Sequence, residues 1–123
     1  MYQLWYNPQM VRERPVSVQF FRLDSGREPV REWLKGMSRE HRKAMGEDVK
    51  TLQFGWPIGM PLARKMDDGL WELRSNLGSG IARTFFTIYE GNIVLLHGFI
   101  KKSQKTPANE LMLAKRRLNK LRS

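Results

Sequence analysis

Charged residues that could perform acid–base chemistry or bind phosphate are interleaved with apolar residues in three segments of this 123-residue chain. Residues 69–74 read Gly-Leu-Trp-Glu-Leu-Arg, residues 81–86 read Ile-Ala-Arg-Thr-Phe-Phe, and residues 97–107 read His-Gly-Phe-Ile-Lys-Lys-Ser-Gln-Lys-Thr-Pro. Fixed charges are costly to bury, so their position among residues suited to a buried sheet indicates a working surface. The charges of this surface suit a phosphodiester.

Glu72, Arg74 and Arg83 are the central residues of this surface. Residues two apart on a strand share a face, so Glu72 and Arg74 are predicted to point away from Trp71 and Leu73, which can enter the core. Arg83 lies early in the next strand and is expected to face the same cleft. RNA cleavage without a metal needs a base for the 2′-hydroxyl, cations for the phosphate and an acid for the leaving oxygen. Glu72 is the leading candidate for the base, and the two arginines are candidates for a forked phosphate clamp.

Further basic residues extend the predicted site. Lys101, Lys102 and Lys105 are expected to bind flanking phosphates or to donate protons from a lowered pKa. The predicted catalytic set is Glu72, Arg74, Arg83, Lys102 and Lys105. The predicted RNA-binding set is Arg64, Lys65, Lys101, Lys102, Lys105 and Arg116.

The charge of the chain supports a polyanionic partner. There are 22 Lys and Arg residues against 12 Asp and Glu, giving a formal net charge of +10. No apolar run approaches the roughly 18 residues that span a bilayer, and no signal sequence is apparent, so we expect a cytoplasmic protein. The chain has no cysteine, and His41 and His97 are isolated, so neither a metal nor another cofactor is expected.

The pattern of residues predicts an α+β domain over residues 16–123, preceded by an extension or arm at 1–15. A strand is expected at 16–23, a helix opened by Pro29 and ended by Gly36, and a second helix capped by Ser38. A loop over 55–69 follows, then strands at 70–75, 81–89 and 93–100, with residues 90–92 as a tight turn. A meander is the simplest topology. A last helix, capped and opened by Thr106 and Pro107, is expected to bury a leucine-rich stripe and expose its cations, Arg117 among them.

With these elements in place, the chain resembles the RelE/ParE toxin superfamily, and within it the phage-derived, HigB-like toxins of type II toxin–antitoxin modules. The resemblance covers about residues 16–121 and rests on the three segments quoted above. It implies a compact α+β fold in which two N-terminal helices pack on a small antiparallel sheet, with a C-terminal helix. It also implies ribosome-dependent mRNA cleavage that inhibits translation, and silencing by a small antitoxin, usually a helix-turn-helix protein. The expected partners are therefore the antitoxin, the ribosome and mRNA.

The family pattern transfers unevenly onto the candidate residues. RelE-type toxins carry lysines where this chain has Glu72 and Arg74, and an arginine where it has Arg83. Arg83 therefore transfers well, Arg74 transfers as a cation, and Glu72 departs from the RelE pattern while fitting the Trp-Glu-Leu-Arg form of the phage-derived branch.

Several alternatives stay open on the sequence. Glu72 and Arg74 could simply pair with each other or with the Lys101–Lys105 cluster on a solvated sheet face, and Arg64 and Lys65 could be solvated loop residues. His97 is expected to be a hydrogen-bonded structural residue rather than a catalytic one. ParE relatives inhibit gyrase without being nucleases, so a non-enzymatic inhibitor and a catalytically decayed nucleic-acid-binding module remain alternatives.

Overall fold

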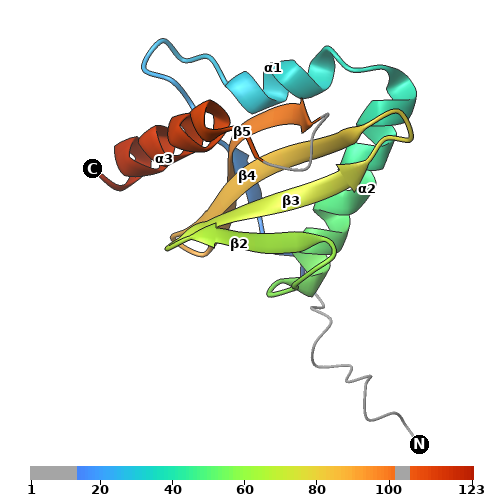
Figure 1. The fold of residues 1–123 in the computed structure, drawn as a ribbon. Helices are drawn as coiled ribbons and strands as arrows, with labels where there is room; N and C mark the ends of the chain where they lie inside the picture. Colours follow the sequence, from blue (N-terminus) through green and yellow to red (C-terminus); the bar gives the residue numbers. More distant parts are fainter. Residues whose placement is uncertain (1–13, 102–105) are drawn as a thin grey trace, which may run out of the picture.

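A five-stranded sheet with helices on both faces forms the protein in the computed structural model, which describes residues 14–101 and 106–123 (Figure 1). The elements in chain order are β1 (Val18–Phe20), α1 (Pro29–Lys35), α2 (Arg39–Gly55), β2 (Ala63–Asp67), β3 (Leu70–Asn76), β4 (Ile81–Tyr89), β5 (Asn92–Lys101) and α3 (Ala108–Arg122). The α+β class predicted from the sequence is confirmed. The expected extension at 1–15 lies almost wholly outside the described residues.

The strand order is β1-β5-β4-β3-β2, and the last four strands of the chain form an antiparallel meander. β1 instead pairs parallel with β5, with Val18 opposite Ile93 and Phe20 opposite Leu95. The sheet is therefore mixed, and the expectation of an antiparallel sheet is wrong. A parallel neighbour needs a long crossover connection, which the two helices and three strands between β1 and β5 provide.

The segment expected to be a loop contains the edge strand β2. The glycines and prolines that suggested a loop, from Gly55 to Pro61, all precede the strand. Ala63 is buried opposite Leu73, and Arg64 lies opposite Glu72. A five-residue edge strand with one buried apolar end carries too little alternation to stand out in the sequence. The strand expected at 16–23 is correspondingly shorter, with only Val18–Phe20 in regular pairing.

Local turn and capping signals are largely confirmed. Pro29 occupies the first position of α1, and the Ser38 hydroxyl caps α2 by accepting the backbone N–H of His41 at 3.2 Å. The β4–β5 turn uses Glu90 and Gly91 at φ values of 50° and 80°, both in the left-handed region. Asn92 was expected to be a turn residue, but it already belongs to β5.

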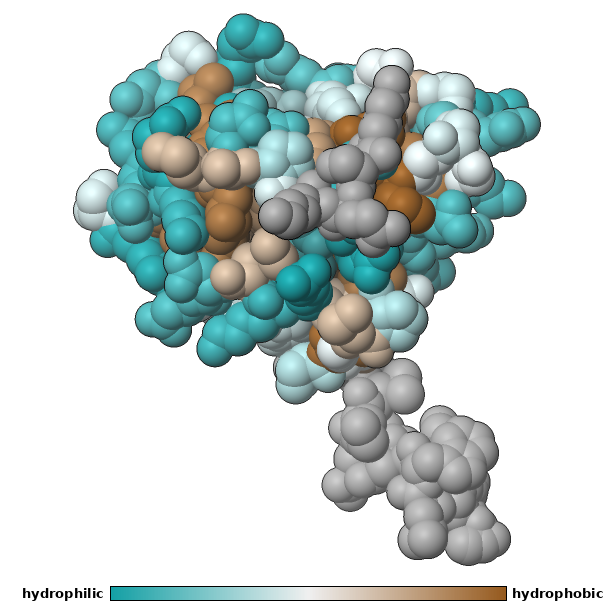
Figure 2. All heavy atoms as spheres, in the orientation of Figure 1, coloured by the Kyte–Doolittle hydropathy of each residue, from teal (hydrophilic) through white to brown (hydrophobic). Residues whose placement is uncertain are grey.

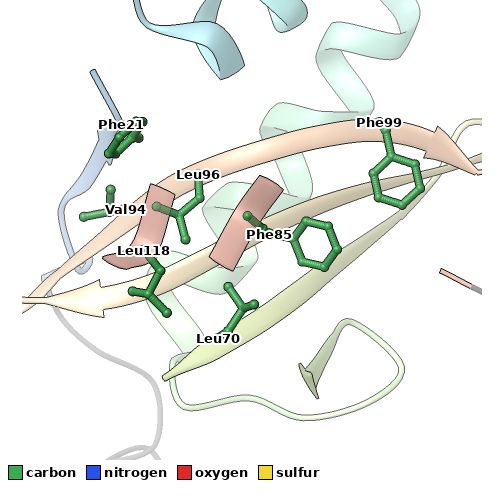
Figure 3. Packing of buried hydrophobic residues seen from close by; sticks show 8 residues of the cluster. Phe21, Leu70, Phe85, Val94, Leu96, Phe99 and Leu118 are labelled. Atoms are coloured by element: carbon green, nitrogen blue, oxygen red, sulfur yellow. The ribbon is translucent and has the colours of Figure 1, made fainter. Parts of the chain in front are cut away.

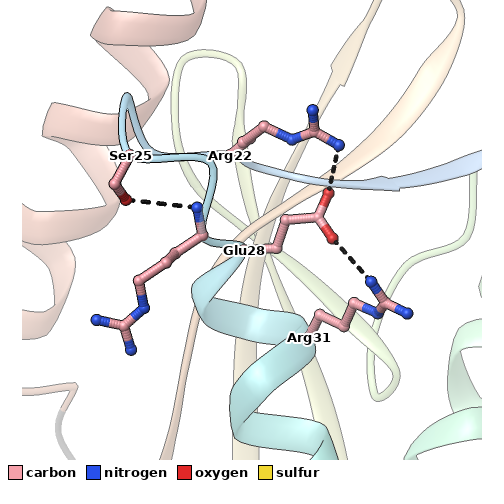
Figure 4. A network of polar contacts seen from close by, with 5 residues as sticks. Arg22, Ser25, Glu28 and Arg31 are labelled. Carbon is pink, nitrogen blue, oxygen red and sulfur yellow. Dashed lines mark hydrogen bonds and ion pairs between the residues drawn. The ribbon is translucent and has the colours of Figure 1, made fainter.

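Charged contacts around Glu28 stabilise the start of α1. The two carboxylate oxygens of Glu28 accept hydrogen bonds from Arg22 Nη2 at 3.3 Å and from Arg31 Nη1 at 3.5 Å. Figure 4 shows the two guanidinium groups on either side of the carboxylate. Both arginines are exposed, so these pairs add only a few tenths of a kcal/mol to about 1 kcal/mol each. Their main effect is to orient the segment that joins β1 to α1.

Two apolar clusters sandwich the sheet and define its faces. The cluster under α3, drawn in Figure 3, joins Ala114 and Leu118 of that helix to Leu70 and Phe85 of the sheet, so we name this side the α3 face. The opposite cluster joins residues of α1 and α2 to the sheet and defines the α1/α2 face. Its buried members are Val30, Leu52, Ala63, Leu73, Phe86, Ile93 and Leu95.

Gly98 allows α1 to approach the sheet closely. A Cβ at this position would overlap the six-membered ring of Trp33, which belongs to α1. The glycine of the His-Gly-Phe sequence therefore serves packing rather than chemistry.

Candidate active site

The pleat of β3 and β4 places Glu72, Arg74 and Arg83 on the α3 face. Glu72 and Arg74 alternate with Leu73, which is buried on the α1/α2 face. Arg74 is the register partner of Arg83, and directly opposed residues of antiparallel strands point to the same side. The predicted juxtaposition of Glu72, Arg74 and Arg83 is thus present in the structure.

The neighbouring strands add two more cations to the same face. Arg64 of β2 lies opposite Glu72, and Lys101 of β5 lies opposite Ile81, which is two residues before Arg83. We call Arg64, Arg74, Arg83 and Lys101 the cation cluster.

Figure 2 views the molecule from the same direction as Figure 1 and shows mostly hydrophilic residues broken by small apolar patches.

Glu72 forms a buried ion pair with Arg83 inside this cluster. Arg83 Nη1 donates to Glu72 Oε1 at 2.6 Å, and the Thr106 hydroxyl donates to Glu72 Oε2 at 3.2 Å. Glu72 is 0% exposed and Arg83 5%. Removing one member of such a pair leaves an uncompensated buried charge, which costs about 3–5 kcal/mol.

These contacts do not suit Glu72 for the role of general base. A base must reach the proton it removes, yet this carboxylate has no exposed surface and both of its oxygens already accept hydrogen bonds. The alternative of a solvated sheet face, on which Glu72 pairs with Arg74 or with the Lys101–Lys105 cluster, does not fit Glu72, because this residue is buried and pairs with Arg83. The geometry instead fits a carboxylate that orients the Arg83 guanidinium.

The two arginines keep hydrogen-bonding capacity after these contacts. In the described residues, the Nε atoms of Arg74 and Arg83 are buried and have no hydrogen-bond partner. A guanidinium has five N–H donors in a planar fork, so both side chains retain donors for another acceptor. The four cations of the cluster outnumber Glu72, the carboxylate that lies among them. The local excess of positive charge favours an anionic ligand.

Lys101 is a buried cation of the cluster, and its pKa is shifted. It is only 4% exposed. Burial lowers the pKa of its ammonium, and the nearby charges of Arg83, Arg74 and Arg64 lower it further, while Glu72 opposes the shift. The charged form of Lys101 therefore has an unfavourable free energy in the folded protein. A bound phosphate would stabilise that charged form.

This lowered pKa predicts how stability responds to removal of the Lys101 charge. The folded-state pKa lies below the unfolded value, so the penalty for the charged form is complete below the folded pKa and disappears as pH rises past the unfolded pKa. We expect Lys101→Met to raise the urea midpoint at neutral pH, with a gain that shrinks in alkaline buffer. Urea titrations across pH measure this, with the exposed Lys65→Met as the control. A gain that is independent of pH would contradict the electrostatic explanation.

Other predicted residues lie elsewhere or outside the described residues. Lys65 is opposite Trp71, so it belongs to the other side of the sheet from Glu72. Arg116 lies on α3 and lines a groove of about 320 Å³ with Arg22 and Lys120, away from the cation cluster. Lys102 and Lys105 are not among the described residues.

His97 connects the sheet to α3. Its Nε2 lies 2.9 Å from Glu110 Oε1, and its ring stacks on both Phe85 and Phe99, which also stack on each other. Arg117, expected to be outward-facing, is half-buried and donates to the Leu96 carbonyl at 2.8 Å. The structure therefore favours the structural interpretation of His97.

Thr106 is the residue of this site that the sequence did not reveal. It was expected to cap α3, but Pro107 occupies the cap position and no side chain bonds there. The Thr106 hydroxyl instead contacts Glu72, 34 residues earlier in the chain. No local pattern could have indicated so distant a partner.

Among residues 14–101 and 106–123, no three His, Cys, Asp or Glu side chains gather closely enough to hold a metal ion, and no helix is long and apolar enough to cross a bilayer.

Comparison with known proteins gives one family. The family model described as Phage derived protein Gp49-like (DUF891) matches residues 32–119, which include α2, α1 from Glu32 onward, β2 to β5 and most of α3. No curated protein matches significantly. The matched region contains the whole cation cluster with Glu72 and Thr106. The chain therefore belongs to the Gp49-like family of phage-derived proteins, which is of the RelE/ParE-like toxin type.

Proposed function

We propose that the protein is the toxin of a type II toxin–antitoxin module and acts as a ribosome-dependent mRNA endonuclease. The observation that carries this proposal is the cation cluster, in which a buried carboxylate fixes Arg83 while Arg64, Arg74 and Lys101 share the same sheet face. Membership of a toxin-like family supports the toxin part of the proposal.

The proposed chemistry is attack of the 2′-hydroxyl oxygen on the adjacent phosphorus, with the hydroxyl proton passing to a solvent water. A new oxygen–phosphorus bond forms while the bond to the 5′-oxygen breaks, so negative charge accumulates on the phosphoryl oxygens. Arg83 and Arg74 stabilise that charge, because fixed donors that require no reorganisation are most effective where charge develops. The lowered pKa of Lys101 suits it to give a proton to the departing 5′-oxygen. Glu72 and Thr106 position Arg83.

The net charge of +10 suits a protein that must reach RNA within the ribosome. The same charge makes an acidic or amphipathic segment the natural form for a neutralising antitoxin, because charge complementarity accelerates association and favours a specific partner. We therefore propose a tight complex with an antitoxin, with helix-turn-helix proteins as the first class to examine.

Expression of the chain alone tests the toxin proposal. We expect bacterial growth to stop on induction and to resume when the cognate antitoxin is supplied. The matched control is the double variant Glu72→Leu with Arg83→Met, which removes the buried pair without leaving one charge unpaired. Unimpaired growth at high expression would contradict the proposal, and growth arrest with intact translated messages would favour the non-enzymatic alternative.

Salt dependence tests the electrostatic part. Each phosphate contact to a single strand contributes about −0.7 to the slope of log affinity against log salt. Arg64→Ala should make that slope for RNA or ribosome binding less steep by about 0.7, the contribution of one phosphate contact. Lys65→Ala, its neighbour on the opposite side of β2, should leave the slope unchanged. Filter binding or fluorescence anisotropy across salt concentrations makes the comparison, and equal effects from the two variants would contradict the assigned face.

A further inference from the structure

A mixed polar groove adjoins the cation cluster at the end of the β3–β4 hairpin, which Figure 1 shows beside the N-terminal half of α2. It has a volume of about 490 Å³, within the range of small-ligand sites. Arg74 lines this groove and also belongs to the cation cluster, so the two regions are continuous. The other lining residues are Ala44, Glu47, Asp48, Pro61, Leu62, Asn76 and Ile81.

The charged side chains that line the groove carry both signs and form no ion pairs with the described residues. Glu47 and Asp48 form no ion pair with any described residue, although the chain as a whole is strongly basic. Arg74 also forms none, and its buried Nε has no partner among residues 14–101 and 106–123. The groove therefore offers carboxylate acceptors on its α2 side and guanidinium donors on its sheet side. Two carboxylates would repel a phosphate backbone, so the groove suits a different part of a nucleic acid.

We infer that this groove binds a nucleobase of the RNA held by the cation cluster, and that it selects guanine. The inference rests on the proposed function and adds a specificity site to it. Guanine presents an imino and an amino donor side by side, which a carboxylate can accept together, and its O6 and N7 accept from an arginine. Single-stranded RNA exposes these edges, and the apolar Pro61, Leu62 and Ile81 supply surfaces for the base plane.

Nucleotide titration tests the groove without relying on cleavage. We expect 5′-GMP to shift the backbone amide signals of Ala44, Asn76 and Ile81 in the full chain, and to bind more tightly than 5′-AMP, 5′-CMP or 5′-UMP. Inosine 5′-monophosphate lacks the 2-amino group and should bind about tenfold more weakly than 5′-GMP. Equal affinity for all of these nucleotides, or shifts confined to the cation cluster, would overturn the inference, as would the absence of any binding.

Substitution of the two acids gives the matched comparison. Glu47→Gln with Asp48→Asn should remove the preference for 5′-GMP over 5′-AMP. Glu40→Gln, in the first turn of the same helix and outside the groove, should retain it. A preference that survives loss of both carboxylates would overturn the assignment of Glu47 and Asp48.

Cleavage mapping separates the inference from the proposed function. On translating ribosomes, the wild type should cut beside guanosine, and the Glu47→Gln, Asp48→Asn variant should cut with about a tenfold smaller preference for guanosine. Cuts without base preference would overturn the groove and leave the endonuclease proposal standing. Selective 5′-GMP binding without any cleavage would support the groove and count against the endonuclease.

Discussion

Replacement of Arg83 by alanine is expected to lower the rate of mRNA cleavage on translating ribosomes by roughly 10²–10³-fold. The physical reason is loss of a preoriented donor that acts where charge develops in the transition state. The same change should also destabilise the fold by about 3–5 kcal/mol, because Glu72 is left as a lone buried carboxylate. Single-turnover cleavage rates and urea unfolding measure the two effects separately.

Removing both charges separates catalysis from folding. The variant Glu72→Leu, Arg83→Met should regain most of the stability lost in Arg83→Ala, since apolar replacements for a buried pair are often neutral or stabilising. Its activity should remain as low as that of Arg83→Ala. Full cleavage activity in either variant would eliminate Arg83 from the proposed mechanism.

Glu72→Gln distinguishes a positioning residue from a base. The neutral amide keeps the shape of the side chain and an oxygen that can accept from Arg83. If Glu72 only positions Arg83, the variant should be slower but keep the wild-type dependence of rate on pH. If Glu72 is the base, the acidic limb of the profile should disappear.

Cleavage should be abolished by a single 2′-deoxynucleotide on the 5′ side of the cut, because the proposed nucleophile is the 2′-hydroxyl of that residue. The unmodified message should yield a 2′,3′-cyclic phosphate end. Primer extension and mass spectrometry of the fragments in a translating extract make both observations, with deoxy substitution two nucleotides upstream as the control. Cleavage should also persist at EDTA concentrations that spare the magnesium of the ribosome. Cutting at the deoxy-substituted site would rule out the proposed attack.

Much of the candidate site follows from the period of a β-strand. Side chains alternate across a strand whatever surrounds it, so Trp-Glu-Leu-Arg at 71–74 places Glu72 and Arg74 together once β3 forms. The short turn at Glu90 and Gly91 likewise makes β4 and β5 neighbours. The helix starts at Pro29 and Ser38 depend on a few adjacent residues and could also be predicted.

Contacts between segments that are far apart in the chain do not follow from local sequence patterns. The parallel pairing of β1 with β5 depends on where the helices lead the chain, and β2 gains its strand form from pairing with β3. Lys101 becomes buried, and the Thr106 hydroxyl reaches Glu72, only once β5 has paired with β4 and the residues before α3 have come against β3.

Local sequence thus determined which residues share a face, because alternation and capping act over a few bonds. Tertiary structure decided what those residues do there. From strand alternation, Glu72 is predicted to lie in the site and to be available as a general base. In the folded protein it is buried and contacts Arg83 and Thr106. Burial and ion pairing are properties of the assembled surroundings of a side chain, and segments far apart in the chain supply those surroundings.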